Sequence, residues 1–427
     1  MPPAGEIGST RNRFSIILAC CLVLLIVLPF PFDRFKLTWP LAAAWNWPWK
    51  LLLPWIAEHV LQLGVDVRNH PWRSGETTWE YVRVGTATAL ALVIAPCWAW
   101  LDRGRTDLDR LDRWLRIYLR VYLAYIFFGY GWAKVIPSQF PPLGPDRLSE
   151  TIGEASPSGL LWAFMGYAVP YTVFGGLCEL AAGALLCFRR TTRLGALAGI
   201  GLMLNLVALN FSYDIGVKLG STFFLLALTY LAAPDIRRLA DMLLFNRATA
   251  PVPEPPSGSV WSNRLGVVLP GVLAGYFFLW GARASWTSAH AAEWGGRFAA
   301  RPALYGLYDV ESVLRRGVAY ALGPADSTNW SRVAIGQPRS TIRLASGSLG
   351  FYTASVDTVA RTLRLGSMVD SSIVVTLGYE RPDSAHLVLR GRLGPDSVEM
   401  RLTRRDESTY RLLSHPFHWT HDRVENW

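Results

Sequence analysis

Glu179 is a carboxylate in an otherwise apolar run, FGGLCELAAGALLCFRRTTR, which spans residues 174–193. A carboxylate in a lipid-spanning helix is costly, so it indicates a buried ion pair or a functional site. Cations occur in comparable runs: Arg120 and Lys134 in RIYLRVYLAYIFFGYGWAKVIP, and Lys218 in FSYDIGVKLGS. The chemistry open to such residues is charge pairing, hydrogen bonding and proton exchange with a polar ligand, or ion passage.

Helix geometry predicts which cation neutralises the carboxylate. Glu179 lies nine residues before Phe188, or about 13 Å from the predicted inner end of its helix at 1.5 Å per residue. Arg120 lies about one turn from the inner end of its own helix, so we expect a bidentate Arg120–Glu179 pair. Whether that pair only fixes helix register or also binds a ligand stays open. Lys134, near the outer surface, either snorkels or points inward.

Other polar residues complete the predicted intramembrane site. Asp214 and Lys218 form an i, i+4 pair, and Asp214 is well placed to cap the helix that follows. Asn205 and Asn210 add uncharged polar groups on the preceding helix. Tyr130 belongs to an aromatic-rich helix whose rings serve as packing and interface anchors, or line a pocket for a flat ring. The candidate pocket residues are Arg120, Tyr130, Lys134, Glu179, Asn205, Asn210, Asp214 and Lys218.

The elements that position these residues follow from composition. The chain is 51% apolar and 17% charged, and its final third is distinctly more polar. We therefore predict a multi-span helical membrane domain followed by a β-rich domain. The net charge of +10 is explained by arginine-rich cytoplasmic loops, so the expected partner is the lipid bilayer and not nucleic acid. The seven predicted spans are 14–31, 83–101, 116–136, 158–188, 194–212, 216–233 and 265–283.

Several local signals refine this layout. The tryptophan-dense segment 37–64 is predicted to lie in the membrane interface, with a re-entrant hairpin as the alternative. Thr77 and Glu80 have capping-box spacing at the start of the second span. Ser156 is a candidate N-cap followed by a proline, and Pro170 should kink the fourth span or mark its real start.

Arginine counting predicts the orientation. With the N-terminus inside, the inner segments carry thirteen arginines, against seven arginines and lysines in the outer segments before the last span. The bias places the N-terminus in the cytoplasm and the C-terminal domain outside. The predicted parts are N-terminal spans and interfacial segment (1–112), a helical bundle (113–245), a Pro-rich linker (246–264), a last span (265–283) and an outer domain (284–427).

The sequence of the predicted outer domain indicates one helical stretch followed by strands. YGLYDVESVLRRGVAYAL (305–322) is predicted to be helical. Alternating runs then predict an antiparallel meander that forms a small barrel or sandwich. These runs are STIRLA, GFYTASV, TLRLG, SIVVTLGYE, AHLVLRGRL, SVEMRLTR and YRLLS. No metal site is predicted: His415, His418 and His421 alternate faces on a strand and lack a matching ligand pair.

Residues 113–245 resemble the DoxX-like family of membrane proteins. The resemblance rests on the arginine-led helix ending Gly131 to Lys134, the stretch GGLCELAAG around Glu179, the loop RRTTRLGA and two further apolar helices. It implies a four-helix bundle and a bacterial origin. Together with the orientation predicted from the arginines, it places the chain in the inner membrane with the C-terminal domain in the periplasm. The family takes its name from a subunit of a thiosulfate:quinone oxidoreductase, although most members have no assigned activity.

Three functions remain open at this point. The first is a quinone-linked redox component with a bound quinone; because no histidine lies in the four-helix core, a bis-histidine haem is excluded there. The second is a transporter of small molecules or lipids, although no broken-helix repeat is visible. The third is a non-enzymatic anchor or assembly factor that presents the outer domain to a periplasmic or membrane protein partner.

Overall fold

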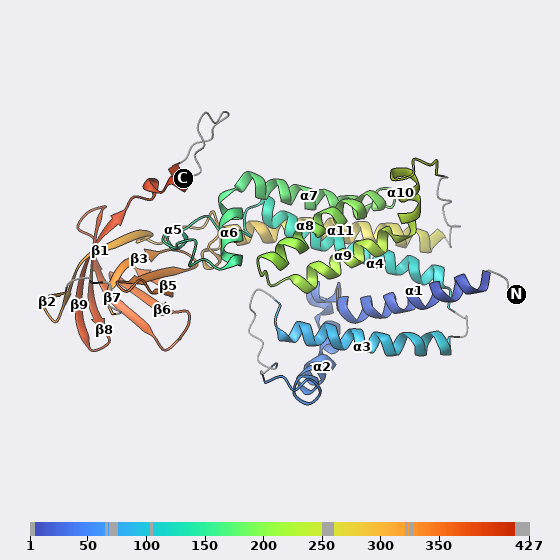
Figure 1. Ribbon diagram of the computed structural model, residues 1–427, viewed down its shortest axis with the longest axis horizontal. Coiled ribbons are helices and arrows are strands. Elements are labelled where there is room, and N and C mark those ends of the chain that lie inside the picture. Colours follow the sequence, from blue (N-terminus) through green and yellow to red (C-terminus); the bar gives the residue numbers. More distant parts are fainter. Residues whose placement is uncertain are drawn as a thin grey trace. The chain divides into compact units, whose positions relative to one another are not determined.

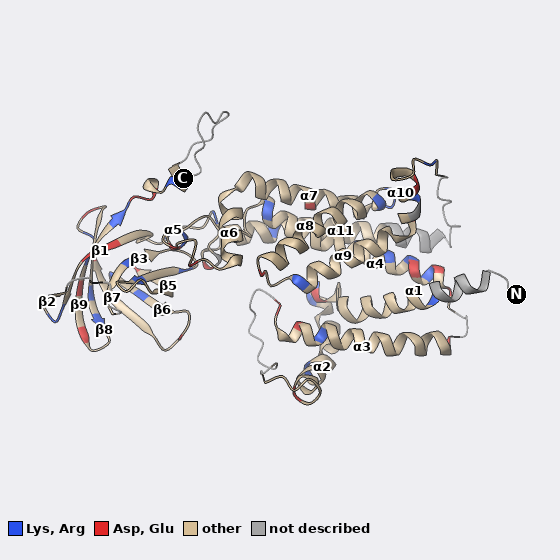
Figure 2. Cartoon of the chain, viewed as in Figure 1, with Lys and Arg blue, Asp and Glu red and all other residues tan. Residues whose placement is uncertain are grey.

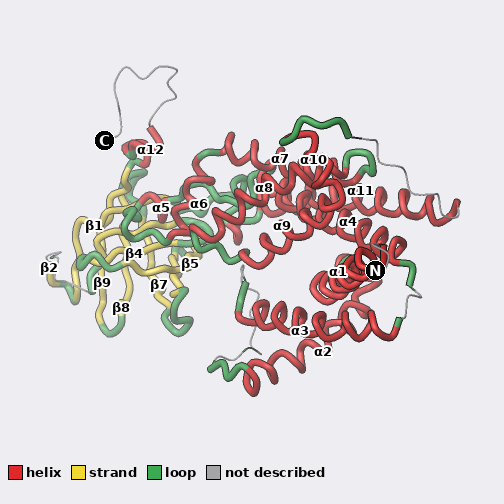
Figure 3. Tube along the Cα trace, turned by 45° about the vertical axis from the view of Figure 1, so that its right-hand side comes forward, coloured by secondary structure: helices red, strands yellow, loops and turns green. Residues whose placement is uncertain are grey.

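The computed structural model describes residues 5–64, 67, 76–102, 106–249, 260–320, 323 and 328–414. The chain forms two compact units, Met1–Trp132 with Phe174–Ala282 and Ala133–Val173 with Arg283–Trp427. Long helices build the first unit, and the second contains all the described strands (Figures 1 and 3). Each unit therefore combines segments that are far apart in the sequence.

Two antiparallel helices open the first unit. At one end, Arg13 of α1 (Gly5–Val27) pairs with Asp102, which follows α3 (Thr78–Leu101). At the other end, Arg83 of α3 donates from Nη2 to the Leu28 carbonyl oxygen at 3.1 Å. The predicted capping interaction starts α3: the Glu80 carboxylate accepts from the Thr77 backbone N–H at 2.8 Å.

The tryptophan-dense segment between these helices is helical. Two short 3₁₀ turns, Phe32–Arg34 and Lys36–Thr38, lead into α2 (Trp39–Trp55), which continues as a π-helical turn, Ile56–Val60. In Figure 1, α2 is turned away from the common direction of α1 and α3. Three of its tryptophans are largely exposed, namely Trp39, Trp47 and Trp55. Exposed indoles suit a headgroup environment, and the interfacial placement itself stays a prediction.

The helical bundle is built around α4. It contains α4 (Leu108–Val135), α7 (Val169–Cys187), α8 (Thr192–Ser212), α9 (Lys218–Ala232), α10 (Ile236–Leu243) and α11 (Val260–His290). Its core is apolar, with Leu119, Leu123, Phe127, Leu228 and Phe277 almost fully buried. Figure 2 shows that most of the length of these helices is uncharged. This distribution fits a bundle whose outer surface contacts lipid.

Four helices of the described chain are long and apolar enough to cross a membrane. They correspond to Arg13–Arg34, Thr78–Asp102, Val169–Cys187 and Thr192–Ser212. The other three predicted spans correspond to α4, α9 and α11, which do not meet this criterion, so the total of seven stays a prediction. α4 carries Arg116, Arg120 and Lys134, and α9 has only 15 residues.

The predicted fourth span, 158–188, is two helices. α6 (Pro157–Tyr167) is followed by Ala168 as its C-cap, and α7 begins at Val169. Pro170 therefore marks the real start of the longer helix, because proline suits the first turn, where its missing N–H is not needed. Ser156 caps α6 as predicted, since its Oγ accepts from the Gly159 N–H at 3.0 Å.

The second unit contains a closed antiparallel barrel. The strands are β1 (Gly306–Arg315), β2 (Val318–Tyr320), β3 (Trp330–Ile335), β4 (Ser340–Leu344), β5 (Leu349–Asp357), β6 (Thr362–Ser367), β7 (Val374–Glu380), β8 (His386–Leu393) and β9 (Asp396–Arg405). Neighbours pair in the order β1-β3-β4-β5-β6-β7-β8-β9, and β1 also pairs with β9, so eight strands close the barrel. β2 extends β1 as a short hairpin. The interior is apolar, with Leu307, Leu363, Leu377, Leu389 and Met400 fully buried.

Two sequence predictions about this domain are wrong. Residues 306–320 of the stretch predicted to be helical, 305–322, form the β1–β2 hairpin instead. Arg316 and Gly317 have φ of 49° and 79°, as a two-residue type I′ turn requires, and glycine favours that conformation. The final predicted strand, YRLLS, instead contains the short helix α12 (Arg411–Ser414).

Candidate functional site

Glycines bring α4 and α7 into close contact around Glu179. A Cβ added to Gly131 would lie 2.9 Å from the Leu180 side chain and 3.0 Å from the Gly176 carbonyl oxygen. A Cβ added to Gly183 would lie 2.9 Å from the Phe128 ring. These separations leave no room for a larger residue at either position, so the glycines allow the two backbones to approach. This contact fixes the depth at which Glu179 is held.

Glu179 and Tyr130 lie at this contact. Glu179 is 3% exposed and immediately precedes Leu180, while Tyr130 immediately precedes Gly131 on the facing helix. Tyr130 is 40% exposed, whereas Glu179 is almost fully covered. A phenol is able to donate a hydrogen bond to a carboxylate or to exchange a proton with it. The two predicted site residues therefore lie on the facing helices of this contact, each next to a residue that forms it.

Lys134 is also buried, at 5% exposed, in the last turn of α4. It follows Tyr130 by four residues, which places both on one side of that helix. Of the two predicted alternatives, the inward orientation is therefore the one adopted. A buried ammonium group is costly to keep charged, so its burial, like that of Glu179, needs a specific reason.

The predicted Arg120–Glu179 pair is wrong. Arg120 donates from Nε to the Leu186 carbonyl oxygen at 2.9 Å and from Nη2 to the Cys187 carbonyl oxygen at 3.0 Å. These acceptors lie in the last turn of α7, about 10 Å along the helix axis from Glu179 at 1.5 Å per residue. The last carbonyls of a helix have no partner within it and carry partial negative charge, so they attract the guanidinium.

Two further arginines cap neighbouring helices in the same way. Arg116 donates from Nη1 to the Tyr230 carbonyl oxygen at 2.9 Å, at the end of α9. Arg83 donates to the Leu28 carbonyl oxygen, just beyond α1. In all three cases the guanidinium lies against the end of an antiparallel helix and donates to a carbonyl oxygen there. We therefore assign the arginines of these helices, Arg120 included, to holding the bundle together.

The predicted pair at the start of α9 forms, but its capping role does not. Lys218 donates from Nζ to Asp214 Oδ1 at 2.5 Å. Because α9 begins at Lys218, Asp214 lies outside the capping position. Glu76 takes that role from the segment before α3, accepting from the Leu219 and Gly220 N–H groups at 2.8 and 2.7 Å. Sequence reasoning missed Glu76, because 143 residues separate it from Leu219.

The two asparagines of the predicted pocket differ in burial. Asn210 is buried in the last turn of α8, whereas Asn205 is exposed on the same helix. The three clustered histidines, His415, His418 and His421, lie outside the described residues. Within the described part of the chain, no group of three histidine, cysteine or acidic residues is arranged to hold a metal ion.

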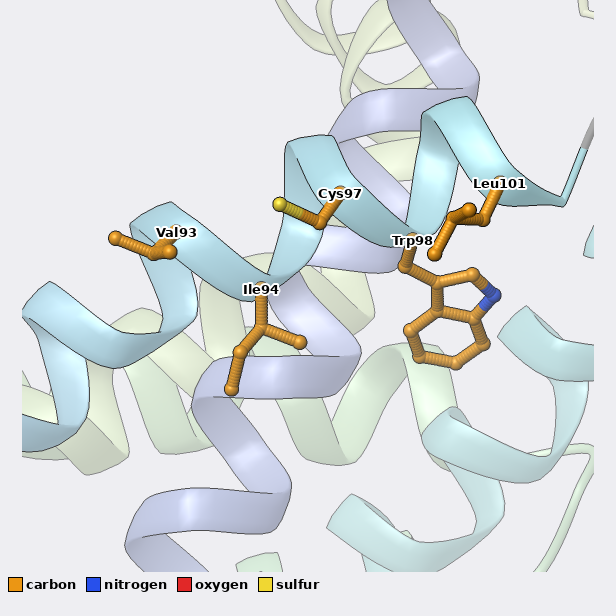
Figure 4. A pocket seen from close by; sticks show the side chains of 5 residues that line it. All are labelled: Val93, Ile94, Cys97, Trp98 and Leu101. Carbon is orange, nitrogen blue, oxygen red and sulfur yellow. The ribbon is translucent and has the colours of Figure 1, made fainter.

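A hollow on α3 is not part of this site. Val93, Ile94, Cys97, Trp98 and Leu101 line it, and all five come from that one helix (Figure 4). The hollow is open and almost entirely apolar, and it includes none of the predicted site residues. Its lining is typical of a lipid-facing groove rather than of a polar binding pocket.

Comparisons with known proteins identify the bundle. Residues 115–211 match the DoxX family model. Over 121 residues, the chain is 36% identical to a Bacillus subtilis (strain 168) protein described as "Uncharacterized protein YwoB". That stretch is 28% of this chain and 75% of the relative. The chain belongs to the DoxX family. No solved structure matches it.

The DoxX match covers the helices that carry the candidate site. It begins at Leu115 in α4 and ends in the last turn of α8, so Tyr130, Lys134 and Glu179 lie inside it. The predicted resemblance to the family is therefore confirmed. The fourth helix of the predicted bundle, α9, lies outside the matched residues, as do α1–α3, α11 and the barrel.

Within the DoxX segment, the loop between α4 and α7 binds to the barrel. Asp146, which is buried in the short helix α5 (Pro145–Leu148), accepts from Arg339 Nε at 3.0 Å. Arg343 of β4 donates to both oxygens of Glu154 at 2.5 and 2.7 Å. We call these two ion pairs the clasp. The Arg343 hydrogen bonds hold the pKa of Glu154 at about 2, below its ordinary value of 4.5.

Further contacts extend the same interface. Arg343 also donates from Nη2 to the Ser149 carbonyl oxygen at 2.9 Å, and the Ser149 hydroxyl lies 3.4 Å from that of Thr341. Arg297 donates to the Gly166 carbonyl oxygen at 2.7 Å. Ser149 and Thr341 are both buried. The loop is therefore an integral part of the barrel unit.

Proposed function

We propose that this DoxX protein is a seven-span membrane anchor that presents its barrel outside the cytoplasm to a protein partner. The clasp is the observation that carries the proposal. It joins a loop inside the DoxX segment to a barrel that begins about 150 residues later. A barrel unit that is tied to the membrane helices through two separate segments of the chain suits the role of an anchored interaction domain.

The ends at which successive helices meet the barrel unit support the seven spans. The last turn of α4, the first residues of α7 and the last residues of α11 all belong to the barrel unit. α7 starts on the barrel side of the membrane and crosses to the other side, and α8 crosses back. Because α11 ends on the barrel side, it must start on the other side, so α9 must cross the membrane between α8 and α11. α9 therefore crosses the membrane with only 15 residues.

The arginine distribution supports the orientation. The turn between α7 and α8 and the segment after α9 are rich in arginine, which is typical of the cytoplasmic side. The barrel then lies on the opposite side of the membrane. In the bacterial membrane that the family resemblance implies, that side is the periplasm or cell exterior.

The barrel has the character of a binding module. Its described core is made of aliphatic and aromatic side chains, and charged residues such as Arg364, Arg390 and Glu399 lie on its outer wall. A filled interior favours recognition on the surface rather than enclosure of a small ligand. The partner is therefore proposed to be a protein on the extracytoplasmic side.

Site-specific photo-crosslinking in cells tests the anchor proposal. A photoreactive residue replaces Val369, which is 87% exposed between β6 and β7, with Leu363, which points into the core, as the matched control. We expect Val369 to give one discrete adduct with an extracytoplasmic protein and Leu363 to give none. Absence of any adduct from Val369 and from other exposed barrel positions, at normal expression, contradicts the proposal.

A second candidate function is favoured by the buried carboxylate. Glu179, buried at the α4–α7 contact, and Tyr130, on the facing helix, offer one proton acceptor and one hydrogen-bond donor to a flat carbonyl ligand of the quinone class. An ionisable residue inside a membrane helix marks a functional site by default, and quinone exchange in this DoxX domain is a function of that kind.

Spectroscopy of the purified protein tests the quinone candidate. We expect an ultraviolet quinone band that reductant bleaches, and we expect it to be lost in Glu179→Gln. Asp214→Asn, which changes an exposed carboxylate, is the matched control and should keep the band. A wild-type protein without bound quinone, before and after incubation with a short-chain quinone, contradicts this function.

A further inference from the structure

A compact turn between α7 and α8 displays several arginines. The Thr191 N–H donates to the Phe188 carbonyl oxygen at 3.1 Å, and the Thr191 hydroxyl donates to the Leu185 carbonyl oxygen at 2.7 Å. These bonds keep the turn tight while Arg189 and Arg190 remain exposed on it. Arg193 follows in the first turn of α8. Three guanidinium groups are thus concentrated within five residues.

A fourth arginine, Arg238, joins this surface through its ion pair with Asp235. The two carboxylate oxygens of Asp235 pair with Arg193 at 2.8 Å and with Arg238 of α10 at 3.4 Å. One carboxylate shared by two guanidiniums leaves a net positive charge. We call Arg189, Arg190, Arg193 and Arg238 the basic cluster. Figure 2 shows basic residues near the α10 label, at this end of the bundle.

Large apolar side chains lie exposed next to the basic cluster. Phe188 flanks the arginine turn, and Leu194 follows Arg193. The α10 segment exposes five more, at Ile236, Met242, Leu243, Leu244 and Phe245. α10 follows α9 after one 3₁₀ turn, so this apolar surface begins where a proposed span leaves the membrane. Exposed apolar side chains beside arginines match the boundary between acyl chains and phosphate groups.

We propose that the basic cluster and the apolar residues around it form a binding surface for anionic phospholipid. The guanidiniums bind the lipid phosphates, and α10 lies in the headgroup region with its apolar side chains toward the acyl chains. A soluble acidic partner would use the arginines but would leave Phe188 and residues 242–245 exposed to water. A lipid surface accommodates both the arginines and the exposed apolar side chains, so we propose lipid as the ligand.

The test uses the full chain in nanodiscs that contain phosphatidylcholine with a minor fraction of phosphatidylglycerol. Native mass spectrometry counts the phosphatidylglycerol molecules that stay bound on release. We expect the triple variant Arg189→Gln/Arg190→Gln/Arg193→Gln to lower its retention at least tenfold. The matched control removes three exposed barrel arginines, Arg361→Gln/Arg364→Gln/Arg392→Gln, and should change nothing. Equal retention in the two variants overturns the proposal.

Wild-type measurements keep the proposal testable if the triple variant does not fold. Phosphatidylglycerol should outcompete phosphatidylcholine for the protein, and 0.5 M salt should weaken that preference, because surface electrostatics are screened. Inorganic phosphate at millimolar concentration should not displace the lipid, since it lacks acyl chains. No headgroup preference, or displacement by phosphate or by an acidic peptide at the same concentration, contradicts a lipid surface.

Discussion

Glu154→Gln should loosen the loop between α4 and α7 from the barrel. In the clasp, Arg343 donates to both Glu154 oxygens and lowers the pKa of this carboxyl from 4.5 to about 2. That fall corresponds to ~3 kcal/mol at 1.36 kcal/mol per pKa unit. Because the Glu154 side chain is 32% exposed, solvent screening reduces the expected contribution to about 1–2 kcal/mol. The glutamine keeps the shape of the side chain and removes its charge.

Hydrogen exchange of the full chain in detergent measures this effect. A loss of about 1–2 kcal/mol corresponds to roughly a 5- to 30-fold larger open population. Amides of residues 144–156 should therefore exchange faster by that factor at pH 7. Glu380→Gln is the control, since it removes a more exposed carboxylate that pairs with Arg390 on the barrel wall. Unchanged exchange in Glu154→Gln, or equal acceleration in the control, refutes the clasp.

The lowered pKa of Glu154 predicts that the stability of the clasp depends on pH. A pKa lowered by folding stabilises the folded form above the unfolded pKa, and this contribution is lost as pH falls through the folded value. For Glu154, the clasp contribution is complete above about pH 4.5 and disappears toward about pH 2. After correction for intrinsic exchange rates, wild-type protection should fall across this window. The Glu154→Gln variant should show a smaller change.

Two further predictions concern the DoxX helices. Gly131→Ala should lower the free energy of unfolding by about 1–3 kcal/mol, because its Cβ would lie 2.9 Å from Leu180; Gly129→Ala, with open space around it, is the control in the same chemical-denaturation assay. Arg120→Met should cost about 2 kcal/mol in that assay through loss of two carbonyl contacts, and Arg120→Lys should recover part of the loss; stability equal to wild type in both variants contradicts the capping role.

Local signals in the sequence predicted local structure well. The Thr77–Glu80 spacing and the Ser156 N-cap both form as expected, and Pro170 marks the start of α7. Each depends on residues within one helical turn, so tertiary structure is not needed to recognise it. Strand alternation likewise located β4 to β9, because burial of one barrel face requires that pattern.

Long-range contacts were beyond sequence reasoning. The depth arithmetic for Arg120 placed it near Glu179 but did not consider the carbonyls at the end of α7, which compete for the same guanidinium. Residues 305–322 have a helix-like pattern, yet the turn at Arg316 and Gly317 and the pairing with β9 decide in favour of strands. The clasp joins residues 189 or more positions apart, and no local pattern signals it.

The central claim is that the α4–α7 loop and the barrel lie together outside the cytoplasm. Single cysteines replace three exposed residues in a background without the five native cysteines: Ile152 in the loop, Val359 in the barrel and Ala248 after α10. Intact cells are treated with a membrane-impermeant maleimide. Positions 152 and 359 should be labelled, and position 248 should be labelled only after permeabilisation. Labelling of 248 in intact cells, or protection of 152 or 359, contradicts the account.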